Sequence, residues 1–181
     1  MIPSDPLPAG AAGAGLPAAP GADPVEAAVF AVLDRVGEPY EVMRIDPAHA
    51  DTAVFCQTYG VPLEHSVNTI VVGSRREPRR FAACLVKATT RLDVNHAVRR
   101  LMGVSRLSFA GAEETRALTG MLIGGVTPFA LPPDLPIYVD EAVLALPWII
   151  LGGGSRACKV KVAPAVLMRL PGVQIVSGLA G

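Results

Sequence analysis

Residues 120–131 read Gly-Met-Leu-Ile-Gly-Gly-Val-Thr-Pro-Phe-Ala-Leu, and this stretch is the most informative part of the sequence. Its two adjacent glycines, Gly124 and Gly125, are followed by Thr127 and Pro128 within an otherwise apolar run. Glycine lets the backbone take a positive φ and approach a ligand closely, and proline fixes φ and removes one donor. Apolar flanks keep such a turn partly dry, which strengthens any backbone N–H that meets an oxyanion or a carbonyl oxygen. The stretch is a candidate ligand loop; the alternative is an ordinary turn between two buried strands.

The bulk composition is that of a globular chain with an aliphatic core. The 181 residues are long enough for one domain, hydrophobic residues make up 51%, and aromatic residues only 5%. The formal net charge is zero. This charge balance argues against an extended basic surface that binds nucleic acid, but it is compatible with a local basic patch.

Cysteine and histidine usage bears on compartment and metal binding. The three cysteines are far apart, odd in number and form no C-x-x-C pair, which favours buried thiols in a reducing, cytoplasmic setting. The three histidines show no metal-ligand spacing, so we expect no metal and no other cofactor. The apolar run 142–151 is too short to span a membrane and contains Pro147, and no secretory signal is apparent, so we expect no membrane association.

The order of elements is expected to mix helices and strands within one domain. Residues 1–22, almost entirely Ala, Gly and Pro, are expected to be a disordered tail, and residues 23–181 to form the domain. Periodicity and capping residues predict helices over 24–36, 52–59, 94–101, 112–118 and 164–170. They predict strands over 40–45, 67–72, 81–86, 137–139, 148–151, 158–162 and 173–176.

The fold class that follows is α/β, with a mixed, curled and barrel-like sheet surrounded by short helices. The charged turn at residues 75–80 joins two of the strands as an antiparallel hairpin. Its arginines are either a solvated surface or, with Arg91, Arg99 and Arg100 further along, a basic flank that meets phosphates.

Several further residues are candidates for chemistry, each with a structural alternative. Gly152–Ser155 follows a buried strand but lacks the Gly-Lys-Ser/Thr ending of a nucleotide-triphosphate loop. Ser155 has no evident histidine or carboxylate partner, which disfavours a catalytic triad. Asp140, at a strand end, is either a site carboxylate or the cap of a helix over 141–144. Cys84 and Cys158 lie in apolar strand patterns and are assigned to the core.

Several of these segments together resemble a known family. They are Thr52-Ala53 opening a helix, Gly60-Val-Pro62, Val67-Asn-Thr-Ile-Val-Val72, Leu118-Thr-Gly120, Gly124-Gly-Val-Thr-Pro-Phe129, Tyr138-Val-Asp140 and Gly152-Gly-Gly154. Over about residues 24–180 the chain resembles the YbaK/prolyl-tRNA synthetase editing-domain family, the trans-acting aminoacyl-tRNA deacylases. The Gly-Gly-Val-Thr-Pro-Phe segment is the most specific part of the match.

The resemblance implies a carboxylic ester hydrolase of translation quality control. Its members are mixed α/β domains that hydrolyse the ester between a small mischarged amino acid and the 3′-terminal adenosine of tRNA. The resemblance implies neither a metal nor a covalent nucleophile; a water attacks, helped by the substrate's own hydroxyl. Such hydrolysis needs a positioned water and oxyanion stabilisation more than a strong nucleophile. The acceptor end of an aminoacyl-tRNA is the implied partner, and an aminoacyl-tRNA synthetase is a further candidate.

The resemblance also implies site residues. The family's Gly-x-x-x-Pro loop corresponds to Gly124–Pro128, which would contact the aminoacyl group through backbone atoms. We therefore assign Asn68, Gly125 and Thr127 to catalysis. Substrate binding is assigned to Lys87, Gly124, Val126, Pro128, Phe129, Asp140, Gly153, Gly154 and Ser155.

One departure from the family concerns Asn68. The editing enzymes carry a lysine here, thought to hold the terminal phosphate, whereas an amide hydrogen-bonds without charge. If the turn spans 75–80, position 68 pairs with position 87 and Lys87 supplies the charge; a one-residue slip places Lys87 on the other face. The alternative function is therefore a non-catalytic module that binds an aminoacyl nucleotide, an amino acid or tRNA.

Overall fold

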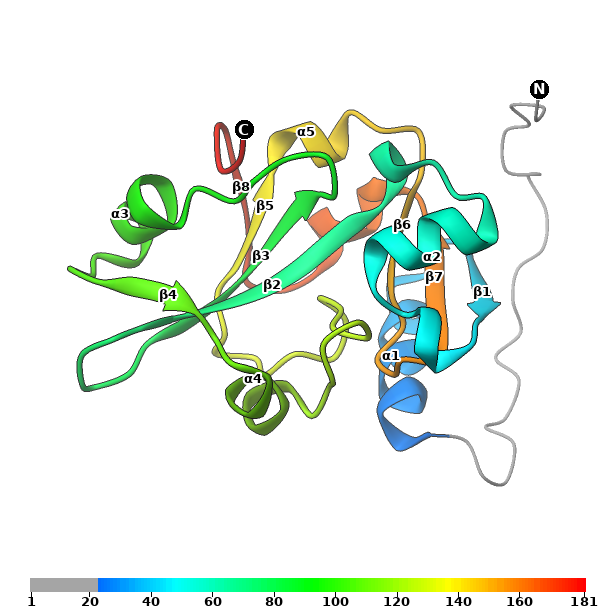
Figure 1. The fold of residues 1–181 in the computed structure, drawn as a ribbon, viewed down its shortest axis with the longest axis horizontal. Coiled ribbons are helices and arrows are strands. Elements are labelled where there is room, and N and C mark those ends of the chain that lie inside the picture. The colour runs from blue at the N-terminus through cyan, green and yellow to red at the C-terminus, as the bar shows by residue number, and fades with distance from the viewer. Residues whose placement is uncertain (1–22) are drawn as a thin grey trace.

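The computed structural model describes residues 23–181 as two β-sheets with helices packed around them (Figure 1). The expected tail at residues 1–22 lies outside the described residues. The three-stranded sheet has the order β1-β7-β6, with β1 (Tyr40–Arg44), β6 (Ile149–Gly152) and β7 (Cys158–Val162). The five-stranded sheet has the order β4-β2-β3-β5-β8, with β2 (Val67–Ser74), β3 (Phe81–Lys87), β4 (Leu107–Phe109), β5 (Ile137–Asp140) and β8 (Val173–Val176).

The helices are short, and three of the α-helices end at Gly37, Gly60 and Gly120, as the sequence predicts. The α-helices are α1 (Pro24–Val36), α2 (Thr52–Tyr59), α3 (Arg99–Met102), α4 (Ala112–Thr119) and α5 (Glu141–Leu144). Residues Val94–Val98 form a π-helix, and Pro47–His49, Leu63–His65 and Pro164–Arg169 form 3-10 helices. Asp23 caps α1 by accepting the Val25 N–H at 2.8 Å, and Gly37 ends α1 at a φ of 75°.

The sheets are mixed, as expected, but they do not close into a barrel. Strand β5 is parallel to β3 and to β8, and the other pairs are antiparallel. The two sheets meet through a single bridge between Ser66 and Ile150. Among the described residues, β4 pairs only with β2 and β8 only with β5, so the edges of the larger sheet stay open. The barrel-like expectation was wrong, because the edge strands β4 and β8 pair neither with each other nor with the three-stranded sheet.

The register of the β2–β3 hairpin also differs from the expected one. The Ser74 N–H donates to the Arg80 carbonyl at 2.8 Å, so only five residues close the turn rather than six. Asn68 therefore lies opposite Val86, and Lys87 lies opposite Val67. Because neighbouring side chains alternate between faces, Lys87 and Asn68 are on opposite faces of the sheet. The predicted pairing of Lys87 with Asn68 was wrong.

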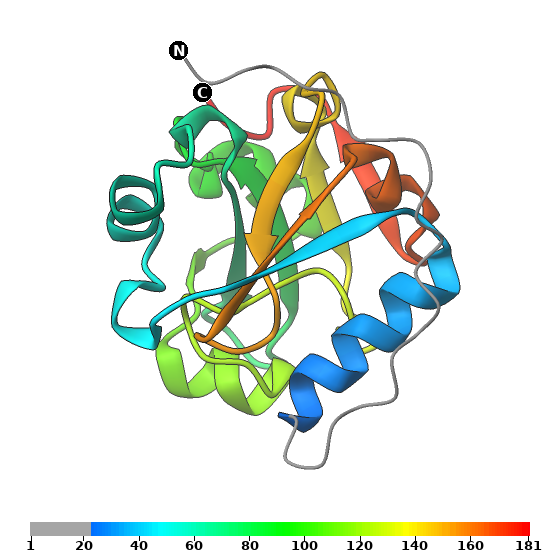
Figure 2. The ribbon, with the colours of Figure 1, turned by 90° about the vertical axis from the view of Figure 1, so that its right-hand side faces the viewer.

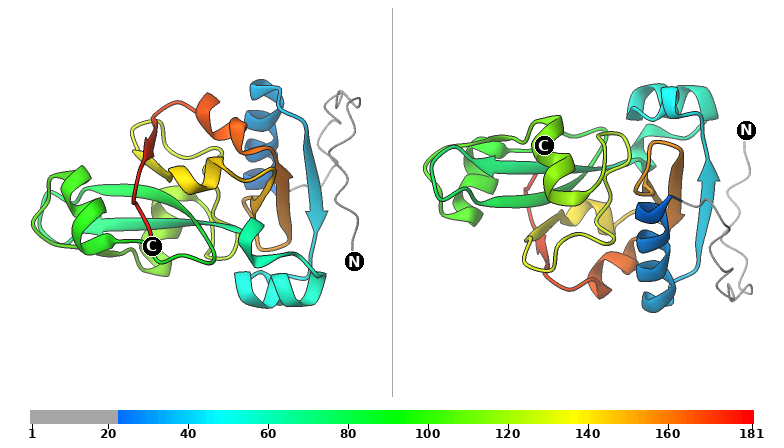
Figure 3. Two further views of the ribbon diagram at one scale, coloured as in Figure 1. Left: turned by 90° about the horizontal axis from the view of Figure 1, so that it is seen from above. Right: turned by 90° about the horizontal axis from the view of Figure 1, so that it is seen from below.

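The larger core cluster fills the space where the two sheets and α1 meet. It contains Val29 and Leu33 of α1, Val160 and Val162 of β7, and Phe129 of the glycine loop. A second cluster lies under the π-helix and α3, on the other face of the five-stranded sheet. Figures 2 and 3 show α1 beside the three-stranded sheet, while α3 and the β2–β3 turn extend to the far end. Within residues 23–181, no helix is long and apolar enough to cross a membrane.

Cys56, Cys84 and Cys158 are free thiols and all three are buried, as their apolar contexts predict. The sequence did not predict strand β4, a three-residue strand with no alternating pattern long enough to detect.

We predict that Phe129→Ala lowers the free energy of unfolding by about 3–5 kcal/mol, because the ring is fully buried in the larger core. Urea denaturation measures the change. Phe109→Ala is the matched control, since 59% of that side chain is exposed, and it should change stability by less than about 1 kcal/mol. Equal effects of the two substitutions would contradict the assignment of Phe129 to the core.

Candidate active-site pocket

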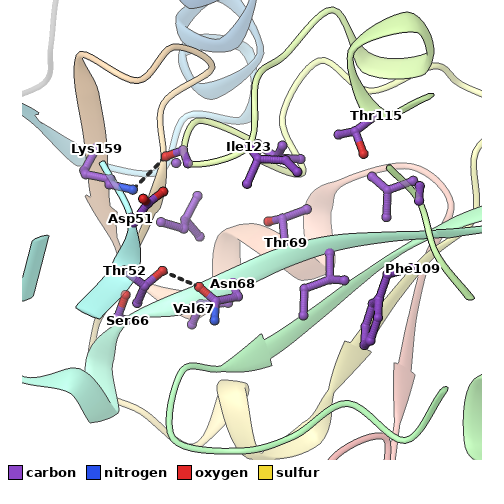
Figure 4. Close-up of a pocket in the computed structure, with 17 residues that line it drawn as sticks. Asp51, Thr52, Ser66, Val67, Asn68, Thr69, Phe109, Thr115, Ile123 and Lys159 are labelled. Carbon is purple, nitrogen blue, oxygen red and sulfur yellow. Dashed lines mark hydrogen bonds between the residues drawn. The ribbon is translucent and has the colours of Figure 1, made fainter. Parts of the chain in front are cut away.

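A cavity of about 320 Å³ opens between the first half of β2, the start of α2, the glycine loop and β7 (Figure 4). Its polar lining comes from Thr52, Ser66, Asn68, Thr69 and Thr115, and its charged lining from Asp51 and Lys159. Its apolar lining comes from Val67, Ile70, Val71, Phe109, Ala110, Ile123, Val126 and Leu151, and Gly124 and Gly152 complete it. The size and the mixed lining are typical of a small-molecule site.

Asn68 is held in place by the first residue of α2. The Thr52 hydroxyl donates to Asn68 Oδ1 at 2.6 Å. This contact uses the acceptor of the amide and leaves its two N–H donors for another partner. The side chain is half-buried at the cavity wall, so it is placed to donate to an oxygen of a ligand.

The glycine loop is shaped by contact with the turn that follows β6. The Gly125 N–H donates to the Leu122 carbonyl at 2.9 Å, and the Gly125 carbonyl accepts from the Gly154 N–H at 2.9 Å. A Cβ on Gly125 would lie 2.5 Å from the carbonyl carbon and oxygen of Ser155. A Cβ on Gly152 would lie 2.4 Å from the Val126 carbonyl oxygen. Two backbone segments thus touch directly, and glycine is required for this approach rather than for approach to a ligand.

The rest of the loop lies behind the cavity wall. Thr127 and Phe129 are both fully buried, and Pro128 is buried between them. The Thr127 hydroxyl is buried and has no hydrogen-bond partner. Of the predicted loop residues, Gly124 and Val126 line the cavity, whereas these three support the loop from behind.

Apart from Asn68, the predicted residues outside the loop do not line the cavity. Asp140 caps α5, with Oδ1 accepting from the Ala142 N–H and Oδ2 from the Ala180 N–H, both at 2.9 Å. Ser155 donates a short hydrogen bond to Glu26 and accepts from the Ala157 N–H at 2.9 Å. Gly153 and Gly154 pack against the core beneath the turn, where a Cβ on Gly153 would meet the Cys158 thiol. Lys87 is likewise not among the residues that line the cavity.

Lys159 is the residue that sequence reasoning missed. Its Nζ donates to the carbonyls of Ala50 and Gly124, each at 2.8 Å, and the residue is only 6% exposed. Burial, together with the positive charge of Arg156, lowers the pKa of Lys159 to about 8. The segment Cys158-Lys-Val-Lys-Val162 alternates like a half-exposed strand, so nothing in it distinguishes the buried Lys159 from the more exposed Lys161.

Within residues 23–181, no three side chains of His, Cys, Asp or Glu gather as a metal site would require. No histidine or cysteine lines the cavity, so a serine or threonine there has no imidazole to activate it. The cavity offers hydrogen-bond donors, one ammonium group and apolar walls. These groups suit the binding and polarisation of a small ester or amide.

Comparison with known sequences places this geometry in a family. The sequence profile of the aminoacyl-tRNA editing domain matches residues 46–170, which include all the residues that line the cavity. The chain therefore belongs to the aminoacyl-tRNA editing domain family.

Solved structures agree with this assignment. A candidate trans-editing enzyme for prolyl-tRNA synthetase is 28% identical, with a TM-score of 0.72 over 86% of this chain and 96% of the other. A hypothetical protein, APE2540, shares the fold at 24% identity, with a TM-score of 0.74 over 84% of this chain and 99% of that one.

We predict that Gly125→Ala lowers the free energy of unfolding by at least about 2 kcal/mol, because the new methyl group would overlap the Ser155 backbone. Gly111→Ala is the control: a Cβ there meets no atom within 4 Å, and its φ of −67° suits alanine. Thermal and urea unfolding of both variants measure the difference. A fully stable Gly125→Ala protein would show that the two turns do not need this close contact.

Proposed function

We propose that the chain is a trans-acting aminoacyl-tRNA deacylase that hydrolyses the ester of a small mischarged amino acid. The observation that carries the proposal is the cavity between β2, α2 and the glycine loop of an editing-domain chain, which is lined by both hydrogen-bond donors and apolar side chains. Its volume of about 320 Å³ is near the lower limit for small-molecule sites, which favours a small aminoacyl group.

The chemistry proposed for the site uses water as the nucleophile. A water oxygen bonds to the ester carbon, and the carbonyl electron pair moves to the oxygen. The bond to the ribose oxygen then breaks, and the proton lost by the water ends on the released hydroxyl. The products are a free amino acid and a tRNA with an intact 3′ end. The protein's contribution is positioning and charge stabilisation, in keeping with a cavity that lacks histidine and cysteine.

Within this proposal, the role of each residue follows from its position relative to the cavity. Asn68 donates to the terminal nucleotide or to the ester, and Gly124 and Val126 form the wall against the aminoacyl side chain. Gly125, Thr127, Pro128 and Phe129 hold that wall from behind. Ile123 lines the cavity and is 50% exposed, so an adenine ring can pack against it.

The test is hydrolysis of a panel of mischarged tRNAs. tRNA for proline charged with alanine, serine or cysteine comes first, because one relative is described as a trans-editing enzyme for prolyl-tRNA synthetase. We expect release well above the spontaneous rate for at least one ester. Asn68→Ala should lower that rate at least about 10-fold through loss of a hydrogen bond to substrate, whereas Gln174→Ala, an exposed amide on β8, should not.

Absence of release from every ester would contradict the deacylase proposal. Binding without release would then favour the alternative, a non-catalytic module for an aminoacyl nucleotide or for tRNA. The substitution of Asn68 for a lysine is the feature of the chain that keeps this alternative open. Rates should be measured with a mock reaction without protein, because these esters also hydrolyse spontaneously.

A local concentration of arginine supports an RNA substrate. Residues 75–106 contain eight arginines and one lysine, but only Glu77 and Asp93 as acids, in a chain whose net charge is zero. Seven of these arginines lie on the β2–β3 turn, on α3 or directly before β4, and these elements lie at one end of the molecule (Figure 1). Exposed Arg75, Arg99 and Arg106 line one hollow there.

Strand β4 connects this hollow to the cavity. Arg106 directly precedes β4, and Phe109 at the other end of β4 lines the cavity. Three residues of strand span about 10 Å, which is about the length of two nucleotides of extended RNA. We propose that the hollow binds phosphates just upstream of the terminal adenosine.

We predict that replacing Arg75, Arg99 and Arg106 together by Gln raises KM for aminoacyl-tRNA at least about 10-fold at physiological salt. The slope of log KM against log salt should also fall by about 2, because up to three phosphate contacts are lost. An aminoacyl-adenosine, which has no phosphate, should be hydrolysed at an unchanged rate. Arg35→Gln on α1 is the control, and an equal effect of that substitution would contradict a local phosphate site.

A further inference from the structure

Lys159 is the cation of the candidate pocket, and it comes from an element that the sequence did not connect with function. Among the residues that line the cavity, it is the one basic side chain, and it is only 6% exposed. It extends from β7, where it pairs with Gly152 on one side and Met43 on the other. Burying an ammonium group in this way is costly unless its charge is neutralised.

The neighbours of Lys159 do not neutralise it. Its Nζ donates to the carbonyls of Ala50 and Gly124 and lies 5.2 Å from the centre of the Phe55 ring. No carboxylate in residues 23–181 forms a salt bridge with it. The nearby carboxylate of Asp51 instead accepts from Arg156 at 3.1 Å. The positive charge therefore remains available to a ligand.

One of the three N–H bonds of the Lys159 ammonium group is left for a ligand. A protonated lysine has three N–H bonds, and the Ala50 and Gly124 carbonyls use two of them. These two contacts also fix the position of Nζ beside the glycine loop, and Figure 4 shows the one made to the loop. A neutral amine would already supply both N–H bonds, so support of the two carbonyls alone does not require the charge.

We propose that Lys159 binds the carbonyl oxygen of the substrate ester and stabilises the negative charge that develops on it. This assignment rests on the proposed deacylase function and deepens it. When water adds to the ester carbon, the carbonyl pair becomes an alkoxide next to the third N–H bond of Lys159. No proton leaves the lysine: the alkoxide pair re-forms the C=O bond as the ribose oxygen departs with the proton derived from the water. A preformed cation in a partly dry site is well suited to this step.

The protonation state of Lys159 gives the proposal a pH signature. Its pKa of about 8 keeps the group mostly charged at pH 7 and neutral well above pH 8. The charged or titratable groups around it are Arg156, Asp51, Cys56 and Cys158. Burial holds the pKa of the Cys56 thiol above its ordinary value and that of Cys158 at about 11, so both thiols stay neutral through this window. Lys159 is therefore the group among them expected to titrate near pH 8.

A matched control lies two residues along the same strand. Lys161 is on the same face of β7, but its Nζ lies 4.9 Å from the centre of the Trp148 ring and 3.7 Å from Glu41. It is more exposed and does not line the cavity. Lys161→Met thus removes the same charge from the same strand without changing the pocket.

We predict that Lys159→Met lowers kcat for the best aminoacyl-tRNA by about 100-fold or more, with a smaller change in KM, as for loss of an oxyanion donor. Lys161→Met should leave both unchanged. For the wild type, kcat/KM corrected for spontaneous hydrolysis should fall as pH rises through about 8, because the free enzyme then loses the charge. An increase through this pH would indicate a general base and would overturn the proposal, as would full activity of Lys159→Met.

An aminoacyl-adenosine distinguishes the carbonyl oxygen from a phosphate as the ligand of Lys159. This substrate keeps the ester and has no phosphate. An equal loss with tRNA and with the nucleoside supports the oxyanion assignment. A loss that appears only with tRNA, in KM alone, assigns Lys159 to a phosphate and overturns it.

A measurement without turnover separates this proposal from the deacylase function and from misfolding of the variant. The chain contains only three lysines, so the Lys159 signal is assignable by NMR with lysine labelled at the side-chain nitrogen. In the wild type, a 3′-aminoacylamino-adenosine, which is not hydrolysed, should raise the pKa of Lys159 as its carbonyl oxygen accepts from Nζ. An unchanged pKa in a saturated complex would overturn the role of Lys159 even if the protein is a deacylase. A raised pKa in a protein that releases no amino acid would support the assignment to the carbonyl oxygen and contradict the deacylase function.

Discussion

The structure depends on direct backbone contact between the glycine loop at residues 120–131 and the turn at residues 152–156. Gly125 and Gly152 have no room for a side chain, and the Gly154 N–H donates across the contact to the Gly125 carbonyl. This contact joins the three-stranded sheet, which carries the turn, to the segment that leads into β5 of the larger sheet. Together with the shared core and the bridge between Ser66 and Ile150, this contact fixes the relative position of the two sheets beside the cavity.

The same contact explains why a buried cation is tolerated in the cavity. Once the loop is fixed, the Gly124 carbonyl faces β7, and the Ala50 carbonyl approaches from the segment before α2; both accept from Lys159. Two carbonyl dipoles offset part of the desolvation cost of the ammonium without cancelling its charge. The Asp51 carboxylate, which would otherwise neutralise it, is held by Arg156. The site is thus built from backbone and charge rather than from a nucleophile and a base.

Much of the fold follows from local sequence. Asp23 and Gly37 bound α1, Gly60 and Gly120 end α2 and α4, and alternating or β-branched runs mark the strands. These signals depend on residues that are neighbours in sequence, so they can be recognised without the tertiary structure. The register of the β2–β3 hairpin could not be inferred from local sequence, because it depends on the Ser74–Arg80 hydrogen bond that shortens the turn. Local sequence also could not show whether the sheet closes into a barrel, because closure depends on the pairing of edge strands that are far apart in the chain.

For the site, the sequence by itself determined the family motif, the glycine loop and Asn68 on the strand beside it. Only the tertiary structure decided that Thr127 and Phe129 lie behind the wall, that Asp140 caps α5, and that Lys159, not Lys87, is the lysine that lines the cavity. The reason is physical: whether a strand lysine faces water or a cavity depends on what packs over that face. For β7 this is α2 and the glycine loop, both of which are distant from β7 in the chain.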